Sequence, residues 1–217
     1  MKNILKIALL AAVLTVPTAM AAQNGAVRFA PIDPGKYTAQ QKQFAELMTK
    51  GPRNGNITNA PFKVYFASPE FGLNAIQMSN YLRWGTGMDA RLSELAIIIS
   101  ARNWGSGYIW HAHYPLAVKG GLDPKIGAAI AAGQRPTGMK EDEEIIYNLL
   151  TEIYRDHDIS EATYARAKAK FGEKGIADIQ GLAAYYGVTA MALITAKATF
   201  PAGDEPKLVA LAQAFPK

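Results

Sequence analysis

The sequence contains no cysteine among its 217 residues. This absence excludes thiol catalysis, disulfide exchange and any zinc site that needs cysteine ligands. Histidine is also scarce, with only three residues in the chain. Because histidine is the side chain whose charge changes most easily near neutral pH, any proton-transfer site is to be sought first around these three positions.

A strong excess of one charge is also missing. The chain has 23 basic and 18 acidic side chains, and the basic ones are scattered without forming a run. Nucleic-acid binding therefore has little support, because it usually shows as a basic patch or stripe. A weakly cationic pocket for a small acid remains compatible with this balance.

The N-terminus has the pattern of a secretory signal peptide. Lys2 and Lys6 precede the apolar run Ile7–Val16, and Ala19-Met20-Ala21 gives a small-x-small cleavage site. The apolar run is shorter than the roughly 20 residues of a spanning helix. We expect residues 1–21 to be removed, with cleavage after Ala21 or Ala22. The mature protein would then be periplasmic or secreted, with no membrane segment.

The remaining chain, residues 22–217, is expected to form one all-α domain, a multi-helix bundle. No segment shows the alternation of apolar and polar residues that is typical of strands. Helix-capping and apolar patterns predict helices over 38–50, 70–84, 86–104, 106–119, 124–133, 141–156, 160–172 and 175–199. Thr86 is expected to cap its helix, with Asp89 at capping-box spacing.

Two of the three histidines lie in one stretch, Glu94 to His113, which forms two predicted helices joined at Gly105. Glu94 is surrounded by aliphatic residues, so it must find a partner or titrate upward. Antiparallel packing of the two helices would bring Glu94 close to His113. Such a pair is a candidate proton-transfer unit, and Arg91, three residues earlier, could pair with Glu94.

The second helix of this stretch carries other candidate residues. Ser106 is expected to cap it, and the stripe that contains Ser106 also contains Trp110 and His113. His111 points elsewhere. Because His111 and His113 are two residues apart, they diverge on a helix, and no metal site is predicted. Tyr108 is a candidate hydrogen-bond donor near His113.

A purely structural interpretation of these residues stays open. A single glutamate in a helical bundle is often a salt-bridge partner, and a histidine on an apolar helix is often a core residue. Perturbed titratable pairs also occur in structural networks. Among the arginines, Arg83, Arg91 and Arg102 could bind a substrate carboxylate by two parallel hydrogen bonds, and Arg91 is the preferred candidate.

The motif R-L-S-E-L-A-I-I, followed by Y-I-W-H-A-H-Y-P-L-A-V-K-G-G-L, resembles the carboxymuconolactone decarboxylase family of the AhpD-like superfamily. The resemblance extends over nearly all of the mature chain. Weaker supporting pieces are Gly51-Pro52-Arg53, Pro61-Phe62, Ser68-Pro69-Glu70, Tyr81-Leu82-Arg83, Phe171-Gly172-Glu173 and Tyr185-Tyr186-Gly187.

The resemblance implies an AhpD-like helical fold and a site at Glu94 and His113, which match the proton-relay positions of redox members. Those members carry Cys-x-x-Cys where this chain has Ser106 and Ile109, so thiol-based hydroperoxide reduction is not expected. Decarboxylating members often have glutamate at the position of Ile109, and His111 is expected to substitute for it in part. Family members usually assemble as trimers or hexamers.

The expected function is therefore that of a cofactor-free lyase or isomerase on a small carboxylate- or carbonyl-containing compound. His113 and Glu94 would be catalytic. Five other residues would contact the substrate: Arg91, Tyr108, His111, Ser106 and Trp110. One alternative is a non-catalytic small-molecule-binding or assembly protein of the same fold. Another is a hydroperoxidase that works without cysteine.

Overall fold

The computed structural model describes residues 28–50, 53–201 and 203–210. Within these ranges the protein is all-helical, with eight α-helices and no strand, which confirms the predicted all-α class. The predicted signal peptide, residues 1–21, and its cleavage site lie outside the described residues. In the described part, no helix is both long and apolar enough to cross a membrane.

The helices follow one another with short connections. Two further turns accompany them: a 3-10 turn over Pro34–Lys36 and a π-helical turn over Tyr81–Gly85, directly after α3. The bounds are α1 Ala39–Thr49, α2 Ala60–Ala67, α3 Pro69–Asn80, α4 Ala90–Asn103, α5 Gly107–Lys119, α6 Pro124–Ala131, α7 Glu141–Asp156 and α8 Glu161–Thr195.

Helix α4 is the centre of the structure. Every residue from Arg91 to Ala101 is buried, and α4 packs against α5, α7 and α8. Its central run, Leu95–Ile99, is apolar on all sides, as expected for a helix that neighbours surround. A charged side chain on α4 therefore has little access to water and needs a partner from another element.

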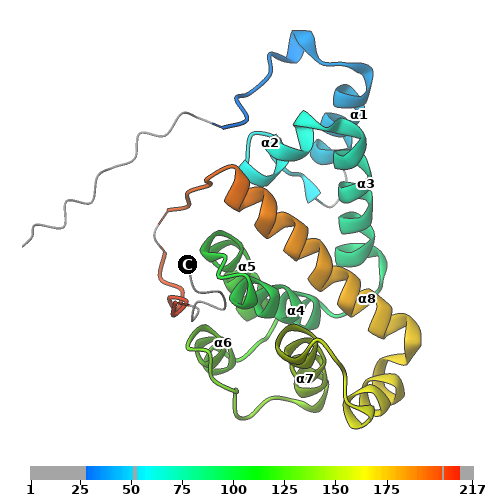
Figure 1. The fold of residues 1–217 in the computed structure, drawn as a ribbon, viewed down its shortest axis with the longest axis vertical. Helices are drawn as coiled ribbons and strands as arrows, with labels where there is room; N and C mark the ends of the chain where they lie inside the picture. The colour runs from blue at the N-terminus through cyan, green and yellow to red at the C-terminus, as the bar shows by residue number, and fades with distance from the viewer. Residues whose placement is uncertain (1–27, 51–52, 202, 211–217) are drawn as a thin grey trace, which may run out of the picture.

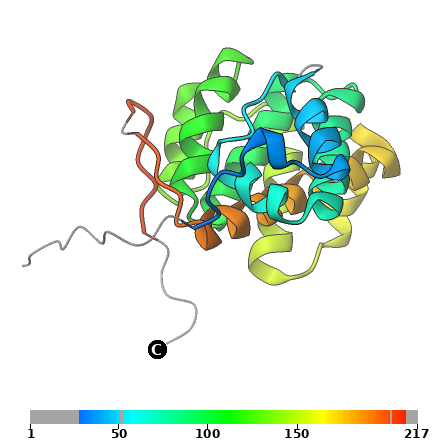
Figure 2. The same ribbon diagram turned by 90° about the horizontal axis from the view of Figure 1, so that it is seen from above.

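Helix α8 runs diagonally across the molecule. In Figure 1, α1–α3 lie on one side of it and α4–α7 on the other. It contacts α2 and α3 as well as α4 and α7. The chain after α8 then passes alongside α5 and α6 (Figure 2), where the backbone N–H of Val209 donates to the carbonyl of Ala131. Because α8 touches both groups of helices, its side chains can complete a site between them.

Local sequence signals set most helix starts. Side chains cap the starts of α1, α5, α6 and α8 at Thr38, Ser106, Asp123 and Ser160, which confirms the predicted cap at Ser106. The predicted Thr86 cap is wrong, because α4 begins at Ala90 and Asp89 is its N-cap. The reason is Gly87, which adopts a left-handed φ of 77° and prevents a helix from continuing between Thr86 and Asp89.

The last two predicted helices form one element, α8, with a break at Gly172. This residue has φ 67° and ψ 173°, a region that is essentially restricted to glycine. The glycine therefore marks a change of helix direction without a loop. The element ends at Thr195, four residues before the predicted end at Thr199.

The break in α8 gives a testable prediction. The substitution Gly172→Ala forces a Cβ into this backbone geometry and should lower the free energy of unfolding by about 1–3 kcal/mol. The control is Glu173→Ala, at an exposed ion pair with Lys168, where the loss should stay below about 1 kcal/mol. Urea unfolding measures both, and equal losses would contradict the explanation.

Candidate active site

Glu94 and His113 are in direct contact. The Oε2 atom of Glu94 lies 2.6 Å from Nδ1 of His113, which confirms the predicted meeting of α4 and α5 at these residues. The other carboxylate oxygen, Oε1, accepts a hydrogen bond of 2.8 Å from the guanidinium of Arg83. Glu94 is only 6% exposed, so both of its oxygens are satisfied by protein groups.

Arg83 reaches Glu94 from the π-helical turn between α3 and α4. Such turns, with their wider backbone spacing, are frequent at functional sites. The Arg83 guanidinium also lies over the ring of Trp84, 4.4 Å from its centroid. The turn therefore supplies the cation that offsets the buried carboxylate.

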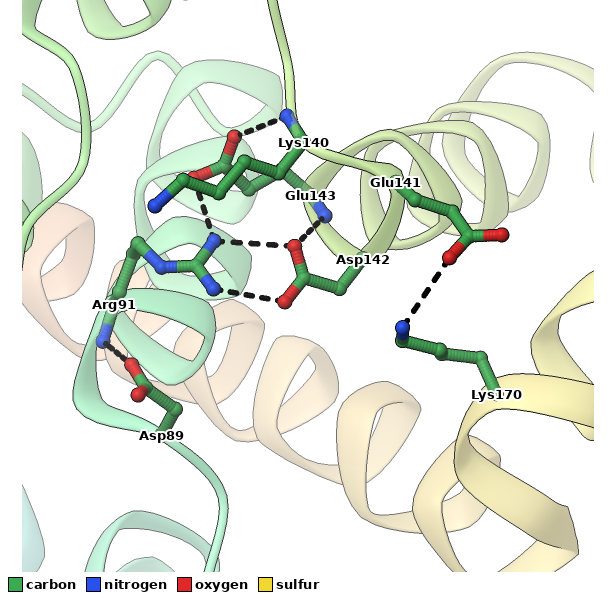
Figure 3. A network of polar contacts seen from close by, with 7 residues as sticks. All are labelled: Asp89, Arg91, Lys140, Glu141, Asp142, Glu143 and Lys170. Carbon is green, nitrogen blue, oxygen red and sulfur yellow. Dashed lines mark hydrogen bonds and ion pairs between the residues drawn. The ribbon is translucent and has the colours of Figure 1, made fainter.

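The predicted pairing of Arg91 with Glu94 is wrong. Arg91 instead binds two carboxylates in the first turn of α7 (Figure 3). Its guanidinium nitrogens donate to Asp142 at 2.8 and 3.2 Å and to Glu143 at 2.5 Å. Two carboxylates on a neighbouring helix outcompete one on its own helix, so Arg91 joins α4 to α7 and does not line the cavity described below.

Tyr186 of α8 completes a chain of hydrogen bonds with Glu94 and His113. Its hydroxyl lies 3.1 Å from Nε2 of His113, and its ring meets the imidazole edge-to-face at 4.8 Å. Because a carboxylate can only accept, Nδ1 of His113 carries the proton and donates to Glu94. Nε2 is then the acceptor, and the Tyr186 hydroxyl donates to it.

Burial and neighbouring charges set the protonation states of the three hydrogen-bonded residues Glu94, His113 and Tyr186. Burial lowers the pKa of His113 although Glu94 acts in the opposite direction. Burial acts to raise the pKa of Glu94, but His113 and Arg83 together hold it below its usual value. Burial also raises the pKa of Tyr186. At neutral pH these three residues are therefore an ionised glutamate, a neutral imidazole and a protonated phenol.

The imidazole of His113 and the phenol of Tyr186 face a cavity of about 290 Å³. This volume lies near the lower end of small-molecule sites, roughly 300 Å³. Residues from α2, α5, α8 and the segments before α2 and α4 line it: Arg53, Gly55, Asn59, Pro61, Phe62, Arg83, Tyr108, Ile109, Ala112, His113, Leu116, Tyr185, Tyr186, Thr189 and Leu193.

Of the five predicted substrate-contacting residues, only Tyr108 lines this cavity. Ser106 caps α5 through the backbone N–H of Ile109. Trp110 is 2% exposed and stacks on Tyr114, so it belongs to the core. The predicted roles of Ser106 and Trp110 in substrate contact are therefore corrected to a helix cap and a packing residue.

His111 points away from Glu94, as predicted, but it does not line the cavity either. Its Nδ1 atom lies 3.0 Å from Glu205, and its ring packs against Phe200. Both partners belong to the segment after α8, seen beside α5 in Figure 2. His111 thus holds this segment against α5, and the expectation that it stands in for a glutamate at Ile109 is not met.

Two residues of the site were not predicted from the sequence as functional. Arg53 and Tyr186 appeared only within motifs of the family resemblance. Tyr186 lies 73 residues from the histidine that it contacts, and neither residue has a local pattern that indicates a site. The Tyr185–Tyr186 pair on an apolar helix was the one available signal for Tyr186.

Comparisons of this chain with protein-family models, with curated proteins and with solved structures found no match. In the described part of the chain, no group of three histidine, aspartate or glutamate side chains is arranged to hold a metal ion.

The protonation of His113 can be measured. We expect its imidazole to titrate below its ordinary pKa of about 6.5 and to carry its proton on Nδ1 when neutral. In the unfolded chain the His113 imidazole takes up its second proton at a higher pH than in the folded protein. The free energy of unfolding should therefore fall as the pH drops below about 6.5. Nitrogen-15 NMR of labelled histidine reports both the pKa and the tautomer.

Glu94→Gln is the control for this measurement. The carboxylate raises the pKa of His113, so its removal should lower that pKa further. A His113 pKa above 6.5 in the native protein, or one that rises in the variant, would contradict the assignment.

The structural role of Arg91 gives a separate prediction. Arg91→Met leaves Glu143, whose side chain is 2% exposed, without its cation, and should lower the free energy of unfolding by about 3 kcal/mol. The matched control is Arg135→Met, which removes an exposed pair with Glu144 and should cost less than about 1 kcal/mol. Chemical denaturation compares them, and similar losses would argue against a buried network.

Proposed function

We propose that this protein is a cofactor-free enzyme that transfers protons on a small carboxylate- or carbonyl-containing compound, as a lyase or isomerase like those of the carboxymuconolactone decarboxylase family. One observation carries the proposal: a neutral imidazole, oriented by a buried carboxylate and hydrogen-bonded to a phenol, lies at the wall of a small cavity.

His113 is the general base in this proposal. Its Nε2 lone pair takes a proton from carbon next to a carbonyl group, either directly or through the oxygen of Tyr186. The imidazolium that forms donates to Glu94 through Nδ1, and this ion pair stabilises the new charge. In an isomerisation the same proton then returns to another carbon of the substrate, so that no external acid is consumed. In a decarboxylation the electron pair of the broken C–C bond stays on the substrate as carbon dioxide leaves, and one proton from water, delivered through His113, protonates that carbon.

Tyr186 and Arg83 assist the proton transfer, Tyr186 as a hydrogen-bond donor and Arg83 as the counter-ion of Glu94. The phenol of Tyr186 stays protonated, and once Nε2 of His113 carries a proton, the phenol O–H is free to donate to an enolate oxygen as charge develops there. Preorganised donors of this kind usually contribute a large part of rate enhancement. Arg83 keeps Glu94 ionised, so that Glu94 remains an acceptor for the His113 proton throughout the reaction.

The proposal includes export and assembly. The N-terminal pattern supports a periplasmic or secreted enzyme. A homotrimer or homohexamer is supported by exposed apolar side chains near the end of α8, where Met191 is 48% and Ile194 61% exposed. Exposed apolar groups that cluster on one helix favour contact with another protein surface.

One observation favours the alternative of a binding protein without catalysis. Both nitrogens of His113 already have protein partners, Glu94 and Tyr186. A network satisfied in this way can serve the stability of the fold alone. In that case the cavity would bind a small molecule and release it unchanged.

The experiment is hydrogen–deuterium exchange in D₂O, followed by proton NMR. The probes are levulinate, 2-oxobutyrate and 5-oxotetrahydrofuran-2-acetate, each of which has C–H groups next to a carbonyl. The protein should accelerate exchange next to the carbonyl of at least one probe. His113→Gln should lower that rate by about 100-fold or more, the usual contribution of a general base.

Two further variants make the test specific. Glu94→Gln should reduce the rate while leaving binding of the probe in place. Tyr154→Phe removes the hydroxyl of a partly buried tyrosine that bonds to Ser100 outside the cavity, and it should leave the rate unchanged. Binding without exchange for every probe would favour the non-catalytic alternative over the proposed enzyme.

A further inference from the structure

The cavity has one polar end and one apolar wall. The polar end contains the guanidinium groups of Arg53 and Arg83, which both lie over the ring of Trp84. The apolar wall comes from α2, α5 and α8 and includes Phe62, Ile109, Ala112, Leu116 and Leu193. A ligand that fills this space needs an apolar body and a group that suits the guanidinium end.

The two arginines at the polar end have different partners. Arg83 donates to the carboxylate of Glu94, so its charge is offset within the protein. Arg53 donates only to neutral oxygens, from Nε to Asn80 at 3.0 Å and from Nη2 to Ser79 at 2.6 Å. Among the described residues no carboxylate forms an ion pair with Arg53.

The Arg53 guanidinium is also held in a fixed orientation. It lies over the rings of Phe62 and Trp84, with its central carbon 5.7 and 5.2 Å from their centroids. Two of its five N–H donors are used by Ser79 and Asn80, which leaves the others for a ligand. Burial lowers the pKa of Arg53, and the charge of Arg83 acts in the same direction, as expected for a cation that lacks a counter-ion.

We infer that Arg53 is the anchor for a single carboxylate, and that the ligand of this cavity is a small monocarboxylic acid with an apolar body. With one of the two positive charges offset by Glu94, the polar end keeps one net positive charge. This balance suits one carboxylate better than a phosphate dianion. A planar carboxylate also matches the parallel donors of a guanidinium.

This inference rests on the proposed function for one point only, the orientation of the ligand. With its carboxylate on Arg53, the remainder of the acid extends along Phe62 and Ile109 and past His113 and Tyr186. Binding itself needs no chemistry at His113. The anchor and the proton transfer can therefore be tested separately.

The test uses isothermal titration calorimetry with the mature protein. The probes are levulinate and phenylacetate, each compared with its neutral amide and, for the aromatic probe, with phenyl phosphate. We expect at least one of the two acids to bind about 10-fold or more tightly than its amide, and more tightly than phenyl phosphate. Equal binding of acid and amide for both pairs, or preference for the phosphate, would overturn the inference.

Substitutions then locate the anchor. Arg53→Met should weaken binding of the acid by about 10- to 100-fold, the usual range for a hydrogen-bonded charge, and Arg53→Lys should weaken it less. The matched control is Lys63→Met, which also removes one positive charge. Lys63 lies on α2 outside this cavity, so its loss should leave the affinity for the acid unchanged. Circular dichroism establishes that each variant is folded.

His113→Gln separates this inference from the proposed function. The variant should still bind the acid while it loses proton exchange. If acids bind through Arg53 and no exchange occurs, the anchor stands and the enzymatic proposal fails. If exchange occurs but Arg53→Met leaves affinity and KM unaltered, the anchor is wrong and the enzymatic proposal stands.

Discussion

The buried carboxylate of Glu94 is the constraint on which the site depends. It lies on a helix whose residues from Arg91 to Ala101 are all buried, where an isolated charge would be very costly. Its two oxygens therefore fix the positions of Arg83 and His113, and His113 in turn fixes Tyr186. Three separate elements are aligned by one ionised group.

The three arginines of the centre differ in the charge of their partners. Arg91 joins α4 to the first turn of α7 through Asp142 and Glu143, and Arg83 neutralises Glu94. Within the described part of the chain, Arg53 is bonded to neutral groups only. Because each of the first two has its own carboxylate, the third remains the only one of these arginines whose charge is available to the cavity.

The sequence predicted the parts of the site that depend on local signals. Apolar spacing placed α4 and α5, the cap at Ser106 placed the start of α5, and the short connection between the two helices made contact between Glu94 and His113 foreseeable. The partner of Arg91 was not foreseeable, because helical spacing favoured Glu94 whereas the actual carboxylates lie 51 and 52 residues away. Arg53 and Tyr186 depend on the packing of distant helices, which no local pattern encodes.

The hydrogen bond between Tyr186 and His113 also has a consequence for biosynthesis. A chain that is made from its N-terminus has Arg83, Glu94 and His113 available well before α8 emerges, but it lacks the phenol and one wall of the cavity until then. Neither the hydrogen bond between His113 and Tyr186 nor the closed cavity can therefore form on a nascent chain that stops short of α8.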